Sequence, residues 1–245
     1  MKLSLMSLVL FGVHSDMLAD VKLPAFFSDH MVFQREMPVP VWGTADAGEI
    51  VTVAFAGQQK TATTEASGKW RVVLDKLSAS AEPRELMVSG NNARKISDVL
   101  VGEVWLASGQ SNMGFLLSNA HNAADALASA TDAQLRVFTV QNATAAEPQG
   151  DVRGKWEASD PKTAKSFSAV AYFFARELRA KLRYPVAILC GHCEVLDVRL
   201  FLGRRTLPDV ALRGWHHELR LPRLVPTRSW PAVSRSSFCQ TTAVP

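Results

Sequence analysis

The first part of the chain shows the alternation of apolar and polar positions that is typical of half-buried β-strands. In the stretch EIVTVAFAG, Val51, Val53 and Phe55 fall on one face, and WRVVL repeats the pattern from Trp70 onwards. Turn signals such as SGK and GNN separate these short runs. Residues 20–98 are therefore predicted to form a small β-sandwich.

After residue 98 the pattern changes to continuous apolar runs that alternate with helical periodicity. The runs VLVGEVWLA, LRVFTV and PVAIL are typical of strands covered on both faces. The stretch NMGFLLSNAHNAADALASA is compatible with a helix, and a loop containing Trp156 is expected after the second strand. Alternating strands and helices predict a parallel α/β sheet over residues 99–189.

The segment SFSAVAYFFARELRAKLR carries the clearest helical spacing in the chain. Ser166 or Ser168 is suited to cap its N-terminus, and Tyr184 followed by proline ends it. The expected apolar stripe of this helix consists of Val170, Phe173, Phe174, Leu178 and Leu182.

The N-terminus has the pattern of an export signal. Lys2 is followed by the apolar run LSLMSLVLFGV and then by Ala19, a small residue suited to cleavage. A first β-strand of the mature fold is the alternative. Residues 1–19 are expected to be a signal peptide, which makes the protein exported, either periplasmic or extracellular. No other run approaches the ~20 apolar residues that a membrane span requires.

Charge is distributed unevenly along the chain. The formal net charge is +4, but residues 190–245 hold 8 arginines against 4 acidic residues, so the preceding part carries equal numbers of basic and acidic side chains. The arginines follow no helical or strand period, and nucleic acid is therefore not an expected partner. All three cysteines lie in the same final segment, which contains no lysine.

The most informative motif is GEVWLASGQSNM, in which Ser111 follows the end of a buried strand. In an open parallel sheet, active groups collect at the carboxyl ends of strands. If a helix starts after the turn, its free N–H groups can stabilise the oxyanion that forms when Ser111 attacks an ester. Capping of that helix by Ser111 is the alternative, and the spacing by itself leaves both open.

The motif SGQSNM and its upstream context resemble the sialate O-acetylesterase family, which are SGNH or GDSL-like hydrolases with an N-terminal β-domain. The upstream segments are LPAFFSDHMVFQREMPVPVWGTADAGEIVTV, GKWRVVL and ISDVLVGEVW, and the later helix FSAVAYFFARELRAKL also matches. The resemblance covers about residues 20–189. It implies an N-terminal β-sandwich followed by an α/β domain with a flavodoxin-like parallel sheet, which is incomplete in this chain.

The resemblance also implies roles for individual residues. Ser111 matches the nucleophile that forms an acyl-enzyme, and its backbone N–H matches one oxyanion donor. Gly109, Gln110 and Asn112 match positions that shape the turn. The implied partner is an O-acetylated sugar or a sialoglycan, and neither a metal nor an organic cofactor is implied.

The base that this family carries in a late Asp-x-x-His block is not found, so the catalytic His and Asp are unidentified. Asp209 and His216 are seven residues apart, His121 follows on the helix expected after Ser111, and His30 is expected to bond locally. Gly191 is a candidate for the glycine oxyanion donor of the family. Without a base, this chain is predicted to hydrolyse esters weakly or not at all.

The final segment departs from the family at one point. Residues 190–245 are predicted to be an unrelated tail, a possible frameshift product; a genuine divergent tail on a non-catalytic relative is the alternative. Cys190 and Cys193 with His192 raise the possibility of zinc, but a structural zinc site requires two ligand pairs, and no metal is predicted.

A second class of function is a non-catalytic carbohydrate-binding β-domain. Trp42 and Trp70 are candidates to stack on a sugar ring, although the alternation of Trp70 with Val72 and Leu74 favours a place in the core. A purely structural or interaction role has no positive support in the sequence.

Overall fold

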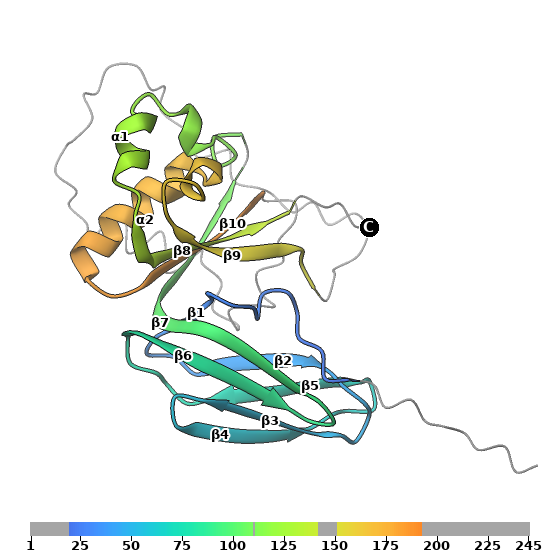
Figure 1. Ribbon diagram of the computed structural model, residues 1–245. Helices are drawn as coiled ribbons and strands as arrows, with labels where there is room; N and C mark the ends of the chain where they lie inside the picture. The colour runs from blue at the N-terminus through green and yellow to red at the C-terminus, as the bar shows by residue number, and fades with distance from the viewer. Residues whose placement is uncertain (1–19, 110, 142–150, 193–245) are drawn as a thin grey trace, which may run out of the picture.

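The structure, a computed structural model, describes residues 20–109, 111–141 and 151–192 (Figure 1). The predicted signal peptide and the segment after residue 192 lie outside the described residues. The described chain is mostly sheet with few helices. We call residues 20–98 the β half and residues 99–192 the α/β half.

Short strands make up the β half, as the alternating pattern predicted. They are β1 (Val32–Gln34), β2 (Val39–Thr44), β3 (Ile50–Phe55), β4 (Gln58–Thr63), β5 (Lys69–Leu74) and β6 (Ser80–Ser89). The apolar positions of β3 and β5 are buried on one face, which confirms the predicted alternation. A long strand, β7 (Ala93–Gly109), begins here and continues into the α/β half (Figure 1).

The α/β half contains three further strands and two α-helices. Its elements are η1 (Leu117–Asn119), α1 (Ala123–Ala128), β8 (Asp132–Val140), β9 (Gly154–Ser159), η2 (Ala164–Ser166), α2 (Ala169–Leu182) and β10 (Val186–His192). No helix in the described part of the chain is long and apolar enough to cross a membrane.

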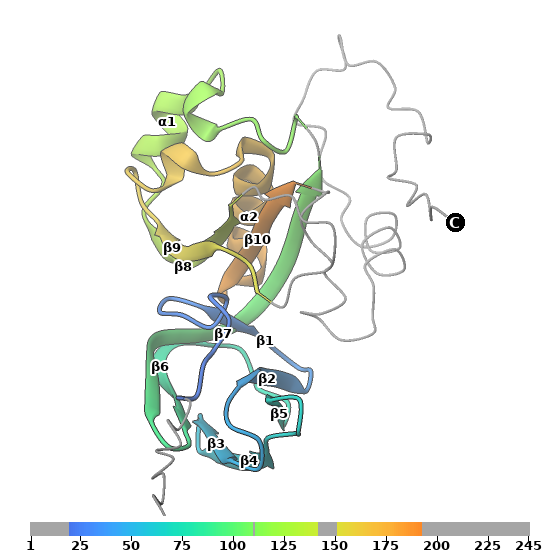
Figure 2. The same ribbon diagram turned by 90° about the vertical axis from the view of Figure 1, so that its right-hand side faces the viewer.

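The main sheet is mixed and runs through both halves. Its strand order is β4-β3-β6-β7-β10-β8-β9, with β1 also paired to β7, while β2 and β5 form a separate two-stranded sheet. The three predicted strands β7, β10 and β8 are parallel to one another, which confirms that part of the expectation. β6 and β9, in contrast, run antiparallel to their neighbours (Figure 2).

The order of the parallel strands corrects the expected flavodoxin-like sheet. In that order the first strand lies between the second and the third, whereas here β10 lies between β7 and β8. β1 occupies the other side of β7 at residues 100–102, and the Gln34 side chain then accepts a hydrogen bond from Val104 N at 2.9 Å. The edge of β7 that faces β1 is therefore already paired where β7 enters the α/β half.

Strand β9 was not predicted. The expected loop around Trp156 is a six-residue strand that pairs with β8 and places the Trp156 side chain in the core. The indole Nε1 donates to Phe26 O at 2.8 Å, a contact between the α/β half and the β half. Because the Trp156 side chain packs against the β half, β9 is stabilised by contacts with residues that are distant in sequence.

One apolar core extends across the boundary between the halves. It contains buried side chains of the β half together with Phe138, Trp156 and Leu189 of the α/β half. A second core lies between the sheet and α2, and includes Leu135, Tyr172 and Ile188. The predicted domain boundary after residue 98 consequently falls inside β7 and beside a shared core.

A charged network marks the point where β7 passes between the halves. Arg136, which is only 2% exposed, donates from Nη2 to Asp98 Oδ1 at 2.9 Å and from Nη1 to Asp98 O at 2.5 Å. His30 Nδ1 lies 2.6 Å from Asp98 Oδ2. The expectation that His30 bonds locally was therefore wrong, because its partner is distant in sequence. Asp98 itself adopts a left-handed backbone conformation, with φ of 57°.

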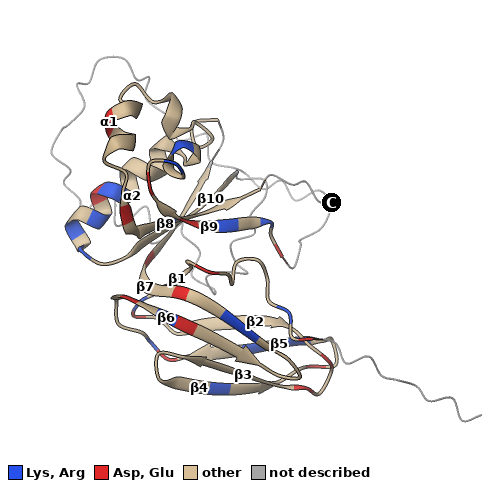
Figure 3. Ribbon diagram, in the orientation of Figure 1, with Lys and Arg blue, Asp and Glu red and all other residues tan. Residues whose placement is uncertain are grey.

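The carboxyl group of Asp98 stays ionised in this network. Burial by itself raises the pKa of Asp98, but the hydrogen bonds from His30 and Arg136 outweigh burial and the pKa is lowered. The buried guanidinium of Arg136 is thereby paired with a negative charge. Elsewhere, acidic and basic residues are interspersed over both halves (Figure 3).

Helix α2 forms where predicted, and Ser168 is its cap, accepting a hydrogen bond from Ala171 N. The expected apolar stripe is confirmed except at Val170: Leu178 is buried, and Phe173, Phe174 and Leu182 are half-buried and pack against the core, whereas Val170 is 51% exposed. The buried face of α2 consists of Ala169, Ala171, Tyr172, Ala175 and Leu178. Small alanines allow the helix to approach the sheet closely, and hydropathy alone gives them little weight.

Candidate active site

Ser111 lies in an exposed turn directly after β7, at the carboxyl end of that strand. Residues 111–114 form the turn, with Phe115 N donating to Asn112 O at 3.4 Å. This location agrees with the sequence-based expectation of a serine at a strand end. Gly109 ends β7 and Asn112 is exposed in the turn, whereas Gln110 lies outside the described residues.

The helix expected after Ser111 does not start there. The chain passes through the turn and η1, and α1 begins only at Ala123, so the stretch 112–130 contains much less helix than predicted. The physical reason is a set of contacts with a distant segment: Leu117 N donates to Phe167 O and Ala169 N donates to Phe115 O, both at 2.8 Å. These bonds hold the backbone extended where a helix would need to coil.

The turn is instead tied to the N-terminus of α2. The capping residue Ser168 donates from its hydroxyl to Met113 Sδ at 3.3 Å, and Leu116 forms a bridge with Ser168. The helix whose positive end lies at this turn is therefore α2, which comes more than fifty residues later in the chain. Sequence adjacency pointed to the wrong helix.

The end of β10 lies beside the end of β7. Cys190 pairs with Ala107 and Gly191 with Ser108, so Gly191 is in register close to the Ser111 turn. Burial raises the pKa of the Cys190 thiol, and a backbone hydrogen bond from Ser168 opposes this only in part. Residues 190–192 thus continue the sheet, three residues beyond the predicted start of an unrelated tail.

Among the side chains that the structure describes, no base is seen next to the serine; the backbone of His192, at the end of β10, pairs with Gly109, two residues before Ser111. Among the described residues, the Ser111 hydroxyl has no hydrogen bond, His30 is bonded to Asp98, and His121 is exposed in the turn before α1. The expectation that His121 lies on a helix was therefore wrong. Asp209 and His216 lie outside the described residues.

Apolar side chains are exposed where the turn meets α2. Phe115 is 46% exposed and Leu116 is 39% exposed, and the backbone bonds of this segment bring both close to Val170 at the start of α2. The Ser111 turn therefore borders an exposed apolar surface.

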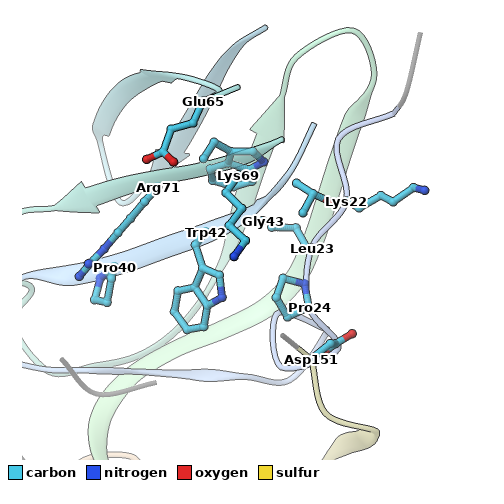
Figure 4. A pocket seen from close by; sticks show the side chains of 12 residues that line it. Lys22, Leu23, Pro24, Pro40, Trp42, Gly43, Glu65, Lys69, Arg71 and Asp151 are labelled. Carbon is cyan, nitrogen blue, oxygen red and sulfur yellow. The ribbon is translucent and has the colours of Figure 1, made fainter. Parts of the chain in front are cut away.

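A separate hollow of about 700 Å³ lies mainly on the β half, with Asp151 of the α/β half as one lining residue (Figure 4). It is lined by Lys22, Leu23, Pro24, Pro40, Trp42, Gly43, Thr44, Glu65, Lys69, Trp70, Arg71 and Asp151. Trp70 is buried in the core wall, as its alternation predicted, while Trp42 is half-buried. The sequence prediction missed the cationic residues of this hollow, although the alternation in GKWRVVL already places Lys69 and Arg71 on the face opposite Trp70.

A metal site is not formed by the described residues, among which no group of three His, Cys, Asp or Glu side chains comes together. Cys190 is a buried free thiol. Cys193, the second cysteine of the predicted Cys-x-x-Cys pair, lies outside the described residues.

Comparison with solved structures indicates the class of protein that this chain resembles. A carbohydrate acetylesterase from Xanthomonas citri is 40% identical and superposes with a TM-score of 0.69, over 70% of this chain and 40% of that one. No family model matches the chain.

Curated relatives narrow the resemblance to sialate O-acetylesterases, as the motif SGQSNM predicted. The sialate O-acetylesterase of Rattus norvegicus is 29% identical over 240 residues, which cover 89% of this chain and 44% of that protein. The sialate O-acetylesterase of Homo sapiens is 29% identical over 207 residues, or 76% of this chain and 39% of that protein. The chain spans less than half the length of the curated relatives it matches.

Proposed function

We propose that the chain carries the nucleophile-bearing part of a carbohydrate O-acetylesterase of the SGNH type, with the β half as an N-terminal β-sandwich. The observation that carries this proposal is the position of Ser111, exposed on a turn at the carboxyl end of β7 and beside the end of β10. The similarity to carbohydrate acetylesterases supports it independently.

The proposed reaction is acyl transfer through Ser111. Its Oγ attacks the acetyl carbonyl carbon, a base takes the hydroxyl proton, and the bond between that carbon and the sugar oxygen breaks to leave an acetyl-enzyme that water hydrolyses. The oxyanion formed in each step needs N–H donors. The backbone N–H of Ser111 is one candidate, and that of Gly191 at the end of the neighbouring strand is a second.

The missing component is the base. A serine hydroxyl is a weak nucleophile without one, and loss of a triad member costs several powers of ten in rate. Because the sequence contains no Asp-x-x-His, we propose that this chain by itself hydrolyses acetyl esters slowly or not at all. The proposed substrate is an O-acetylated sugar such as an O-acetyl sialic acid, and the proposed location is outside the cytoplasm.

Hydrolysis of 4-nitrophenyl acetate by the full chain and by Ser111→Ala tests the proposal. Ser118→Ala is the matched control, because Ser118 is also exposed and lies seven residues further along. We expect a rate at least ~10³-fold below that of an ordinary esterase, and loss of the residual enzyme-dependent rate only in Ser111→Ala.

Labelling with a fluorophosphonate, followed by peptide mass spectrometry, examines the nucleophile without requiring turnover. We expect slow modification at Ser111 and at no other serine. Modification that persists in Ser111→Ala would refute the assignment of the nucleophile. A Ser111-dependent rate typical of ordinary esterases would instead refute the proposal that the base is missing.

A further inference from the structure

The hollow on the β half has features of a binding site that differ from those of the Ser111 turn. Its walls come from β2, β5 and the segment at Lys22, which is held beside β2 by hydrogen bonds in both directions with Thr44 at 2.8 and 3.0 Å. The hollow is therefore bounded by paired backbone and is formed before any ligand arrives.

Trp42 provides a fixed aromatic surface in this hollow. Its indole packs edge-on against Phe27, with ring centroids 4.7 Å apart, and lies nearly parallel to Phe26 at 6.5 Å. These rings restrict the side chain, yet it is only half-buried and lines the hollow. An indole face held in this way can stack on the apolar face of a ring-shaped ligand.

Two cationic side chains lie beside the indole. Trp42 pairs across the strands with Arg71, and Thr44 pairs with Lys69, so both cations project from the same face as Trp42. Figure 4 shows Arg71 and Lys69 on either side of Trp42 and pointing the same way. In the part of the chain that the structure describes, neither cation forms an ion pair, and the same is true of Lys22.

Among the described residues, the nearby carboxylates form no ion pair with these cations. Glu65 bonds Ser67 at 3.2 Å, and Asp151 Oδ1 accepts hydrogen bonds from Ala25 N and Val152 N. Asp151 keeps a second oxygen that can accept hydrogen bonds from hydroxyl groups. The hollow thus offers an aromatic face, a cationic edge and a carboxylate acceptor.

A buried donor also belongs to the lining of the hollow, on the face of β5 opposite Lys69 and Arg71. Among the described residues, Trp70 Nε1 has no hydrogen-bond partner although the side chain is 2% exposed. The ring corner that carries this nitrogen faces Gly43, since a Cβ there would lie 2.8 Å from Trp70 Cζ2 and 3.1 Å from Cε2. Both residues line the hollow, and a buried donor without a partner is unusual.

We propose that this hollow binds a saccharide bearing a carboxylate, with the ring on Trp42 and the carboxylate at Lys69 and Arg71. The site is distinct from Ser111 and would hold a glycan while an ester elsewhere on it meets the serine. The choice of a saccharide over another anion rests on the proposed function; the choice of an anion rests on the unpaired cations.

Isothermal titration of the full chain with N-acetylneuraminic acid tests the proposal. The main variant is Lys69→Gln with Arg71→Gln, which changes two exposed side chains and leaves the core intact. Lys95→Gln is the matched control, because Lys95 is an exposed lysine outside the hollow. Trp42→Ala examines the stacking surface, and Ser111→Ala separates this site from the esterase turn.

We expect the double variant to bind about tenfold or more weakly, the range for loss of charge-assisted hydrogen bonds. Binding should weaken with added salt, and Lys95→Gln and Ser111→Ala should bind like the original chain. Equal affinity in the double variant, loss of binding in Ser111→Ala alone, or no binding at about 10 mM sugar overturns the proposal. A failed acetate assay removes the esterase proposal without changing these results.

Discussion

Replacing Asp98 by asparagine tests whether the charged network of His30, Asp98 and Arg136 stabilises the fold at the joint, the point where β7 passes between the two halves. Asparagine keeps a short polar side chain that tolerates the left-handed conformation of residue 98, so the substitution mainly removes the negative charge. The guanidinium of Arg136 remains buried, with its side chain 3% exposed, and loses its only ion pair among the described residues.

The magnitude follows from the geometry of the pair. Removing one partner of a fully buried ion pair costs about 3–5 kcal/mol, and a hydrogen bond to a charged group contributes about 1.5–3 kcal/mol. Asp98 is 31% exposed, and Arg136 keeps its bonds to the carbonyl oxygens of residues 98 and 133. We therefore expect a loss near the lower end, about 2 kcal/mol in the free energy of unfolding.

Urea unfolding of the full chain, followed by tryptophan fluorescence, measures this loss. Asp75→Asn is the matched control, because Asp75 is 77% exposed and pairs with Lys60 at 2.6 Å; a surface pair contributes about 0–1 kcal/mol. If Asp98→Asn destabilises the chain no more than Asp75→Asn does, the network does not stabilise the joint.

The pH dependence gives an independent check of the sign. The pKa of Asp98 is lowered in the folded chain, so its contribution is complete above the unfolded value of about 3.8 and is lost as pH falls through the lower folded value. The difference between the original chain and Asp98→Asn should therefore close below pH 3.8. A difference that persists unchanged in that range would contradict an ionised Asp98.

Two other predictions concern the core. Trp156→Phe removes the 2.8 Å bond to Phe26 O and leaves that carbonyl without its donor, and urea unfolding should show a loss of about 1–3 kcal/mol; an unchanged midpoint would mean that water replaces the indole. The Cys190 thiol, buried and with a raised pKa, should react with Ellman's reagent at pH 8 far more slowly in the folded chain than in 6 M urea. The double substitution Cys193→Ser with Cys239→Ser leaves Cys190 as the one cysteine that can react. Equally fast reaction in both conditions would show that the end of β10 is accessible to the reagent in the folded chain.

The strands of the β half could be predicted because their signal is local. Val51, Val53 and Phe55 alternate within six residues, and the structure buries all three. The position of Ser111 at a strand end was equally local. The attachment of the Ser111 turn to α2 could not be predicted locally, because it depends on Ser168, which is distant in sequence. The charged network likewise depends on Asp98 and Arg136, which are 38 residues apart.

Errors in the helices and in the hollow have a different origin. Hydropathy favoured Val170 for the buried face of α2, but the residues buried there are mostly alanines, together with Tyr172 and Leu178. In GKWRVVL the inward positions were predicted correctly, while Lys69 and Arg71 gain meaning only beside Trp42 on a neighbouring strand. Short-range patterns identify faces, but they do not show which faces meet.

The continuity of β7 also sets an order of events during synthesis. Its first part can pair with β6 as soon as the two emerge, but its second part must wait for β10, whose Val186 pairs with Glu103. At about 5–20 residues per second, the ribosome needs roughly 4–16 s to add the ~80 residues between them. During that interval, the first part of β7 can already be paired with β6, while its second part still lacks its parallel neighbour β10.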